Sequence, residues 1–133
     1  MLKLEIVTPE KRVFDAEVDS VTVPTTTGEA GILPNHAPLI SALKPGILSY
    51  SVKGVSEKFA VAGGFVEVNA NKVAVLADTA ETAEEIDLNA AKSDRENAEK
   101  TLSAAASGSI EDNEAVREQL AAANVRILLA SGK

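Results

Sequence analysis

The sequence predicts two units of different class, an N-terminal two-layer antiparallel β-sandwich over residues 1–86 and a C-terminal antiparallel two-helix hairpin over residues 87–133. Composition carries this prediction because it changes near residue 86. All five prolines, all four aromatic residues and twelve of the fourteen valines lie in the first unit. The second unit holds eleven alanines and neither proline nor aromatic residue. Valine and aromatic residues favour strands, whereas alanine favours helix.

Short strands are expected throughout the first unit. Leu2, Leu4 and Ile6 alternate with charged residues, which places one face of a strand on a core. The apolar positions then slip by one across Asp19 and Ser20, which indicates a bulge or bend. Further strands, separated by glycine and asparagine turn signals, are expected at 47–53, 55–62, 65–70 and 72–77. The spacing of these runs favours two packed antiparallel sheets.

The second unit is expected to form two helices after the polar acidic stretch 78–85. Asp87 can cap a first helix from Leu88 to about residue 106, and Gly108 can end it. Ser109 and Asp112 resemble a capping box for a second helix that reaches about residue 130. Spacing by three and four residues predicts an interhelical seam formed by Leu88, Ala91, Arg95, Ala98, Leu102 and Ala105 with Val116, Leu120, Ala123, Ile127 and Ala130.

The hairpin is expected to be stable only when it is docked. Its seams carry few large aliphatic side chains, and their burial does not obviously offset the entropy of ordering both helices. An alanine-lined pair beyond a polar hinge is a candidate for an element that detaches and rearranges. The alternative is a fixed C-terminal cap on the sandwich.

Charge and composition exclude several classes of function. Twenty acidic against 13 basic residues give a net charge of −7, which disfavours binding to nucleic acid or to an anionic membrane surface. There is no cysteine and one histidine, so no cofactor and no metal site is expected. Glu84, Glu85 and Asp87 could chelate a cation, although such charges before a helix usually form a solvated first turn. The charged N-terminus and the lack of long apolar runs predict a soluble protein without a targeting segment.

The segment 28–39 is the most informative stretch for function. Two glycines and two prolines predict a tight, stiff loop that presents Glu29 and His36. No nucleophile motif accompanies the single histidine, so no catalytic residue is assigned. The alternative for His36 is a hydrogen bond to the loop backbone. Gly63 and Gly64 are interpreted as a close backbone approach at the start of a strand.

Several segments, in chain order, resemble one known family. They are Thr8-Pro9, Val13-Phe14-Asp15, the loop Gly28–Leu39, Lys44-Pro45-Gly46, Gly63-Gly64-Phe65-Val66-Glu67-Val68 and Val75-Leu76-Ala77-Asp78-Thr79-Ala80. Together they are similar to the epsilon subunit of F-type ATP synthase, whose mitochondrial counterpart is called delta. The resemblance implies a non-catalytic rotor subunit with a ten-stranded sandwich that packs on the gamma subunit and the c-subunit ring. It couples rotation of the ring to the catalytic head.

The resemblance also implies residue roles. Glu29 and His36 correspond to loop residues of the family, and the loop approaches the c-ring. The C-terminal helices can lie beside the sandwich or extend along the shaft and restrain ATP hydrolysis. In the extended form Arg117 and Arg126 are candidates to meet an acidic segment on the beta subunits of the alpha/beta hexamer. Nine residues place these two arginines about 180° apart on a straight helix, so both cannot face one acidic patch.

Some members of the family bind ATP through a motif at the start of the first helix. Ile86, Asp87 and Ala91 match this motif, but Ala90 stands where the family has arginine. A phosphate oxygen would lose a charge-assisted hydrogen bond there. We therefore expect weak or absent ATP binding, with Lys92 pointing elsewhere on the helix.

The family implies a peripheral membrane protein on the cytoplasmic face of a bacterial plasma membrane or the stromal face of a thylakoid. It would meet the membrane only through the complex and would bind no nucleic acid. One alternative is a free-standing β-sandwich that binds a small ligand, with the helices as a dimerisation hairpin. A small hydrolase is disfavoured by the single histidine.

Overall fold

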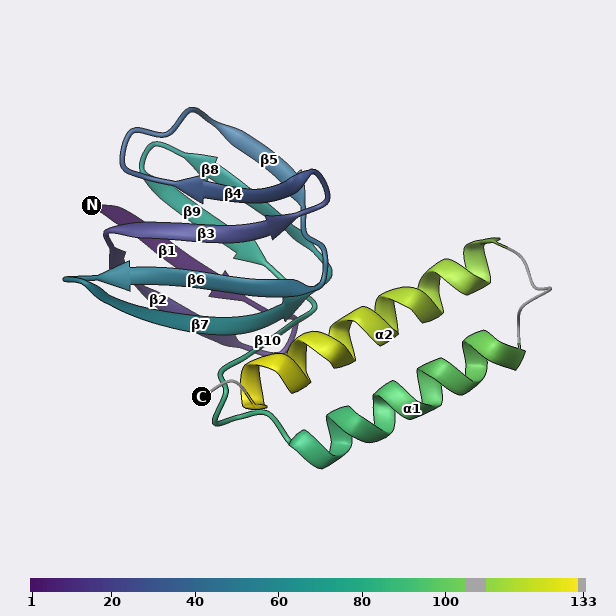
Figure 1. Cartoon of the computed structure of the whole chain (residues 1–133). Helices are drawn as coiled ribbons and strands as arrows, with labels where there is room; N and C mark the ends of the chain where they lie inside the picture. Colours follow the sequence, from purple (N-terminus) through teal and green to yellow (C-terminus); the bar gives the residue numbers. More distant parts are fainter. Residues whose placement is uncertain (105–109, 132–133) are drawn as a thin grey trace.

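The computed structural model describes the backbone of residues 1–104 and 110–131, and the side chains of all of these except 104 and 110–113. Ten strands precede two helices, as Figure 1 shows. The strands form two five-stranded sheets, and the predicted fold class, a β-sandwich followed by a two-helix hairpin, is confirmed. The predicted cap at Gly108 and the Ser109–Asp112 capping box depend on residues or side chains outside this description.

The first sheet, here called the β1 sheet, has the strand order β2-β1-β9-β8-β5. Its strands are β1 (Leu2–Val7), β2 (Arg12–Val18), β5 (Leu39–Ala42), β8 (Phe65–Asn69) and β9 (Lys72–Leu76). All neighbours are antiparallel except β1 and β9, which run parallel. A parallel pair is possible here because β1 and β9 are far apart in the chain, and parallel strands need a long connection.

The second sheet, here called the β6 sheet, has the order β10-β7-β6-β3-β4 and is antiparallel throughout. Its strands are β3 (Ser20–Thr25), β4 (Gly28–Ile32), β6 (Gly46–Val52), β7 (Val55–Ala62) and β10 (Thr79–Glu81). The sequence did not predict β4, β5 or β10. All three lie at sheet edges and have at most five residues, and β10 is polar at two of its three positions. Such short strands contain too few alternating apolar and polar residues to be recognised from the sequence.

The core lies between the two sheets. Leu2, Leu4 and Ile6 are fully buried, as their alternation predicted. The slip at Asp19 is the place where the chain passes from β2 in one sheet to β3 in the other, so the predicted bend is a corner between layers. The Asp19 carboxylate accepts a hydrogen bond from the Lys53 backbone N–H at 2.8 Å, which ties this corner to the β6–β7 turn.

The Gly63-Gly64 turn brings two backbone segments together, as its interpretation from the sequence required. Both glycines have positive φ, at 73° and 84°. A side chain at Gly64 would overlap the carbonyl oxygen of Leu76, and one at Gly63 would overlap the Asp78 carboxylate. Glycine is therefore required at both positions by conformation and by space.

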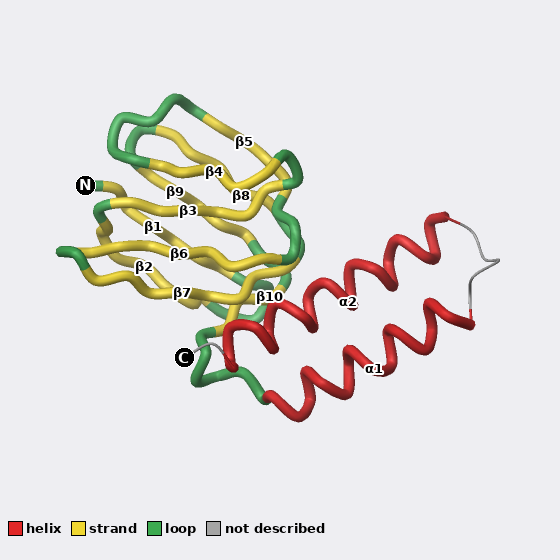
Figure 2. Tube along the Cα trace, viewed as in Figure 1, coloured by secondary structure: helices red, strands yellow, loops and turns green. Residues whose placement is uncertain are grey.

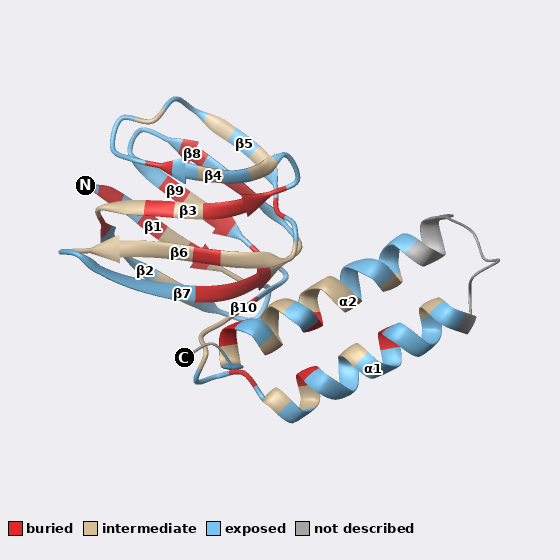
Figure 3. Cartoon of the chain, in the orientation of Figure 1, coloured by how far each residue is buried: buried red, intermediate tan, exposed pale blue. Residues whose placement is uncertain are grey.

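Helices α1 (Leu88–Ala104) and α2 (Ile110–Ser131) lie side by side, and Figure 2 shows the connection from β10 to α1. Asp87 caps α1, as predicted, because its carboxylate accepts a hydrogen bond from the Ala90 backbone N–H at 3.0 Å. Ala91, Ala98 and Ala123 on the predicted seam are buried, and Figure 3 shows buried positions in red on both helices. The alanines let the helices approach closely.

Candidate functional site

The candidate site is the junction between the sandwich and the hairpin. The C-terminal part of α2 packs on β6 and β7, while the rest of the hairpin projects away from the sandwich (Figure 1). Leu129, Ile86 and Ala60 form a small buried cluster at this contact. Ile47, Ala83, Val125 and Ala130 are partly buried against it. Among the described residues, the packing of the hairpin on the sandwich is therefore concentrated at this end of α2.

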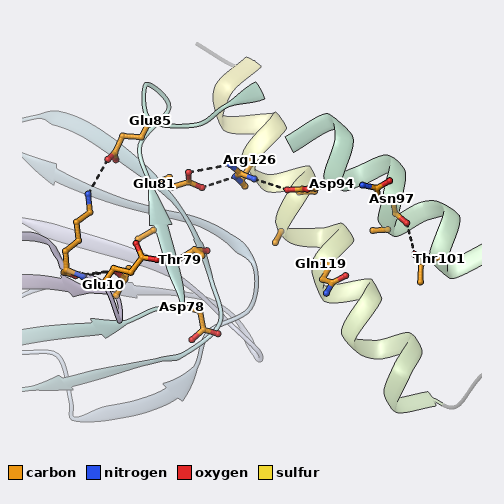
Figure 4. Close-up of a pocket in the computed structure, with 16 residues that line it drawn as sticks. Glu10, Asp78, Thr79, Glu81, Glu85, Asp94, Asn97, Thr101, Gln119 and Arg126 are labelled. Carbon is orange, nitrogen blue, oxygen red and sulfur yellow. Dashed lines mark hydrogen bonds and ion pairs between the residues drawn. The ribbon is translucent and has the colours of Figure 1, made fainter. Parts of the chain in front are cut away.

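Arg126 lies at the centre of the junction and connects three elements, as Figure 4 shows. Its Nε is 2.8 Å from Oε1 of Glu81 on β10 without hydrogen-bond alignment, and its Nη2 donates a hydrogen bond to Oε2 of the same carboxylate at 3.5 Å. Its Nη1 donates to Oδ2 of Asp94 on α1 at 3.3 Å. The side chains of Arg126 and Glu81 are 22% and 29% exposed, so water screens this pair less than an ordinary surface pair.

A cavity of about 800 Å³ lies beside Arg126, between the edge of the sandwich and both helices. Polar side chains from α1 and α2 line it, among them Asn97, Thr101 and Gln119. Its lining carries five carboxylates and two cations, which are Glu10, Asp78, Glu81, Glu85, Asp94, Lys11 and Arg126. Because carboxylates outnumber cations, the cavity disfavours an anionic ligand.

Glu85 organises the hinge that leads into α1. Its carboxylate accepts hydrogen bonds from the backbone N–H and the hydroxyl of Thr82, at 3.0 and 3.1 Å, and lies 3.9 Å from the Lys11 ammonium. The backbone N–H of Thr82 is the main reason why the pKa of Glu85 is lowered, with the hydroxyl and Lys11 acting in the same direction and partial burial opposing them. Hydrogen bonds to the ionised carboxylate thus hold the hinge turn in place.

The three residues that match the nucleotide motif have structural roles in this fold. Ile86 is buried in the junction cluster, Ala91 is buried in the helix seam, and Asp87 caps α1. None of the three lines the cavity. Their placement is accounted for by packing and capping.

The two predicted loop residues lie apart. Glu29 is an exposed residue at the start of β4, next to the β3–β4 turn, so segment 28–32 is a strand and not part of a loop. His36 follows β4 by four residues, beyond its other end, and its Nδ1 lies 2.6 Å from the Ala37 carbonyl oxygen. Figure 1 shows these two connections at opposite ends of the sandwich. The short distance from the His36 ring to the Ala37 carbonyl fits the alternative interpretation, in which His36 hydrogen-bonds the loop backbone.

The two predicted arginines also differ in environment. Arg117 is exposed on α2, whereas Arg126 is partly buried in the junction. Sequence reasoning did not identify Glu81 and Asp94 as partners of Arg126. They are 45 and 32 residues away along the chain, and no local spacing relates them to Arg126.

An apolar row on the outer face of the β1 sheet was also not predicted. The register aligns Ala42 with Phe65, Phe65 with Leu76, and Leu76 with Val7. Phe65 and Leu76 are 45% and 41% exposed because their strand neighbours point into the core and alternation turns these two outward. Ile40 on β5 is exposed close to the same row. An outward apolar row of this kind is a candidate contact surface.

Comparison with known proteins decides the family. Residues 1–83 match the family model described as "ATP synthase, Delta/Epsilon chain, beta-sandwich domain". The chain belongs to the ATP synthase delta/epsilon family. It is 54% identical over 101 residues to the ATP synthase epsilon chain of Carboxydothermus hydrogenoformans, covering 76% of this chain and 75% of that one. It is 52% identical over 99 residues to that of Desulfitobacterium hafniense strain Y51, covering 74% and 75%.

The fold of this epsilon-family chain is similar to solved structures of the same class. A chain in the Euglena gracilis mitochondrial ATP synthase structure that contains OSCP, F1 and the c-ring matches with a TM-score of 0.77 at 24% identity, over 93% of this chain and 78% of that one. A chain in the Tetrahymena thermophila central stalk and c-ring structure matches with a TM-score of 0.54, over 63% and 68%.

The described part of the epsilon-family chain holds no group of three or more histidine or acidic side chains arranged to bind a metal ion. Neither helix, over its described residues, is long and apolar enough to cross a membrane.

Proposed function

We propose that this chain is a non-catalytic rotor subunit of the central stalk of ATP synthase. It couples rotation of the c-ring to the catalytic head during proton-driven ATP synthesis, and its hairpin restrains ATP hydrolysis. The observation that carries the proposal is the attachment of the hairpin to a rigid sandwich through one small contact and one arginine. The sandwich suits the coupling of rotation, and the weakly held hairpin suits the regulation of hydrolysis.

The outer face of the β1 sheet is the proposed contact with the gamma subunit. Its row of Val7, Leu76, Phe65 and Ala42 crosses four strands and offers apolar area on a rigid surface. Ion pairs such as Lys3–Asp15, at 3.5 Å, lie beyond it on the same sheet. An apolar centre with a charged margin is the usual arrangement of a protein interface.

The contact with the c-ring is proposed at the β3–β4 end of the sandwich, where Glu29 is exposed. The Glu29 carboxylate would add little affinity for a basic loop of the c-ring. It would mainly determine how the sandwich is positioned on that loop. His36 was proposed for the same contact. His36 lies beyond the C-terminal end of β4, whereas Glu29 lies near its N-terminal end, so the two residues must be tested separately. Of the two, we propose Glu29 as the c-ring contact.

The regulatory role is proposed for α2. For Arg126 to meet an acidic segment of the beta subunits, it must first leave Glu81 and Asp94. Arg117 is exposed with the hairpin folded and needs no such release. We propose that the chain works at the cytoplasmic face of a bacterial plasma membrane or the stromal face of a thylakoid, and that it reaches the membrane only through the complex.

Reconstitution with a gamma subunit and the alpha/beta hexamer tests the proposal. The full chain should bind gamma and lower the ATPase rate, whereas a chain truncated after Glu85 should bind gamma and leave hydrolysis faster. Equal inhibition by both chains would refute the regulatory role of the hairpin. Failure of both chains to bind gamma would refute the rotor assignment and favour a free-standing ligand-binding module.

A further inference from the structure

Arg126 connects three elements that the chain could otherwise separate. Its guanidinium contacts Glu81 on β10 and Asp94 on α1, and the arginine itself belongs to α2. We infer that Arg126 is a ligand-independent latch: its ion pairs act together with the packing of the junction cluster to keep the hairpin folded on the sandwich, so that release of the hairpin depends on ionic strength and not on nucleotide. This inference rests on the proposed mobility of the hairpin.

The position of Arg126 makes its ion pairs effective. Val125 and Leu129, beside and one turn beyond it on α2, pack in the junction cluster. The Arg126–Glu81 pair therefore lies at the border of an apolar contact, where the effective dielectric is lower than on an open surface. Asp94, in contrast, is 61% exposed, and its pair with Arg126 is the weaker of the two.

In the described lining of the cavity, the latch leaves no vacant cation for a phosphate group. Of the two cations that line the cavity, Arg126 is paired with two carboxylates and Lys11 faces Glu85. A nucleotide would have to displace internal carboxylates in a lining that is already net negative. The carboxylates of Glu81 and Asp94 thus occupy the place beside Arg126 that the phosphate of a ligand would need.

The balance between ion pairs and apolar packing makes the latch sensitive to salt. The junction cluster has only three buried residues, so ion pairs form a substantial part of what holds the hairpin. Screening length falls from about 10 Å at 0.1 M salt to about 3 Å at 1 M. Raising the salt concentration should therefore weaken the latch while the core of the sandwich, which is apolar, stays intact.

Energy transfer within the full chain can measure the latch. The chain has no cysteine, so Ser56→Cys on β7 and Ser103→Cys on α1 give two specific dye sites on exposed residues. In the otherwise unchanged chain, the ratio of folded to released hairpin should fall as KCl rises from 0.05 to 1 M. Arg126→Gln should lower this ratio about tenfold at low salt and remove most of the salt dependence. Arg117→Gln, a matched change on the exposed part of α2, should behave like the parent.

Two further measurements keep the inference falsifiable. The charge reversal Glu81→Arg with Arg126→Glu should recover part of the lost ratio, which a merely misfolded variant would not do, and circular dichroism should show an intact sandwich. Millimolar ATP with magnesium should leave the ratio unchanged. A parental ratio and salt response in Arg126→Gln, or closure of the hairpin by ATP, would overturn the latch. Binding of the same variants to gamma is measured separately, so loss of the latch and loss of the rotor role are distinguishable.

Discussion

Leu129 and Leu128 are neighbours on α2 with opposite environments, and they provide a matched test of how the hairpin is held. Leu129 is 9% exposed in the cluster with Ile86 and Ala60, whereas Leu128 is 62% exposed. Truncating a buried leucine to alanine costs about 2–5 kcal/mol. Because the junction cluster is small and lies at the surface, we expect about 2–3 kcal/mol for Leu129→Ala, near the lower limit of that range. Leu128→Ala should cost less than about 0.5 kcal/mol.

Amide hydrogen exchange gives the result for each unit separately. In Leu129→Ala the protection of amides in α1 and α2 should fall about 30- to 150-fold, which corresponds to the expected energy. Protection in β1 and β9, at the centre of the sandwich, should not change. An equal loss of protection in both units would show that the chain unfolds as one cooperative body, and an equal effect of Leu128→Ala would show that the junction packing is not what holds the hairpin. Either result would refute the reasoning.

Three further outcomes are expected. In urea denaturation, Gly64→Ala should lower the free energy of unfolding of the sandwich by about 3 kcal/mol or more, because it combines positive φ with a backbone clash. The control Gly54→Ala, at a position with positive φ and open space, should cost about 1 kcal/mol. The lowered pKa of Glu85 means that its ionised form stabilises the hinge above the ordinary glutamate pKa and that this contribution is lost as the pH falls through the lowered value. NMR titration should detect that loss in the parent and not in Glu85→Gln. Phe65→Glu should abolish binding to gamma in a pull-down without unfolding the chain, and Val55→Glu, at another exposed apolar position, should not.

Prediction from the sequence succeeded where one residue pattern determined the environment. Alternation placed Leu2, Leu4 and Ile6 in the core, and three- and four-residue spacing placed Ala91 and Ala98 on the helix seam. It failed where the environment depends on distant segments. The edge strands are defined by their neighbours more than by their own residues, as the short strand β10 beside β7 illustrates.

The candidate site was only partly predictable for the same reason. Arg126 could be selected as a charged residue on α2, but its partners are brought to it by the docking of the hairpin on β10 and α1. The outward row was hidden because Phe65 and Leu76 appear in the sequence as ordinary members of apolar strands. Only the cross-strand register shows that the two lie side by side and face solvent.

The parallel pairing of β1 with β9 has a consequence for biosynthesis. Strand β1 lies in the interior of its sheet, between β2 and β9, yet β9 is completed only at residue 76. The β1 sheet therefore cannot close during synthesis until residue 76 has emerged, and until then one edge of β1 lacks its partner strand and is open to aggregation. The helices follow all ten strands in the chain, so the surface on which they dock can form before they do.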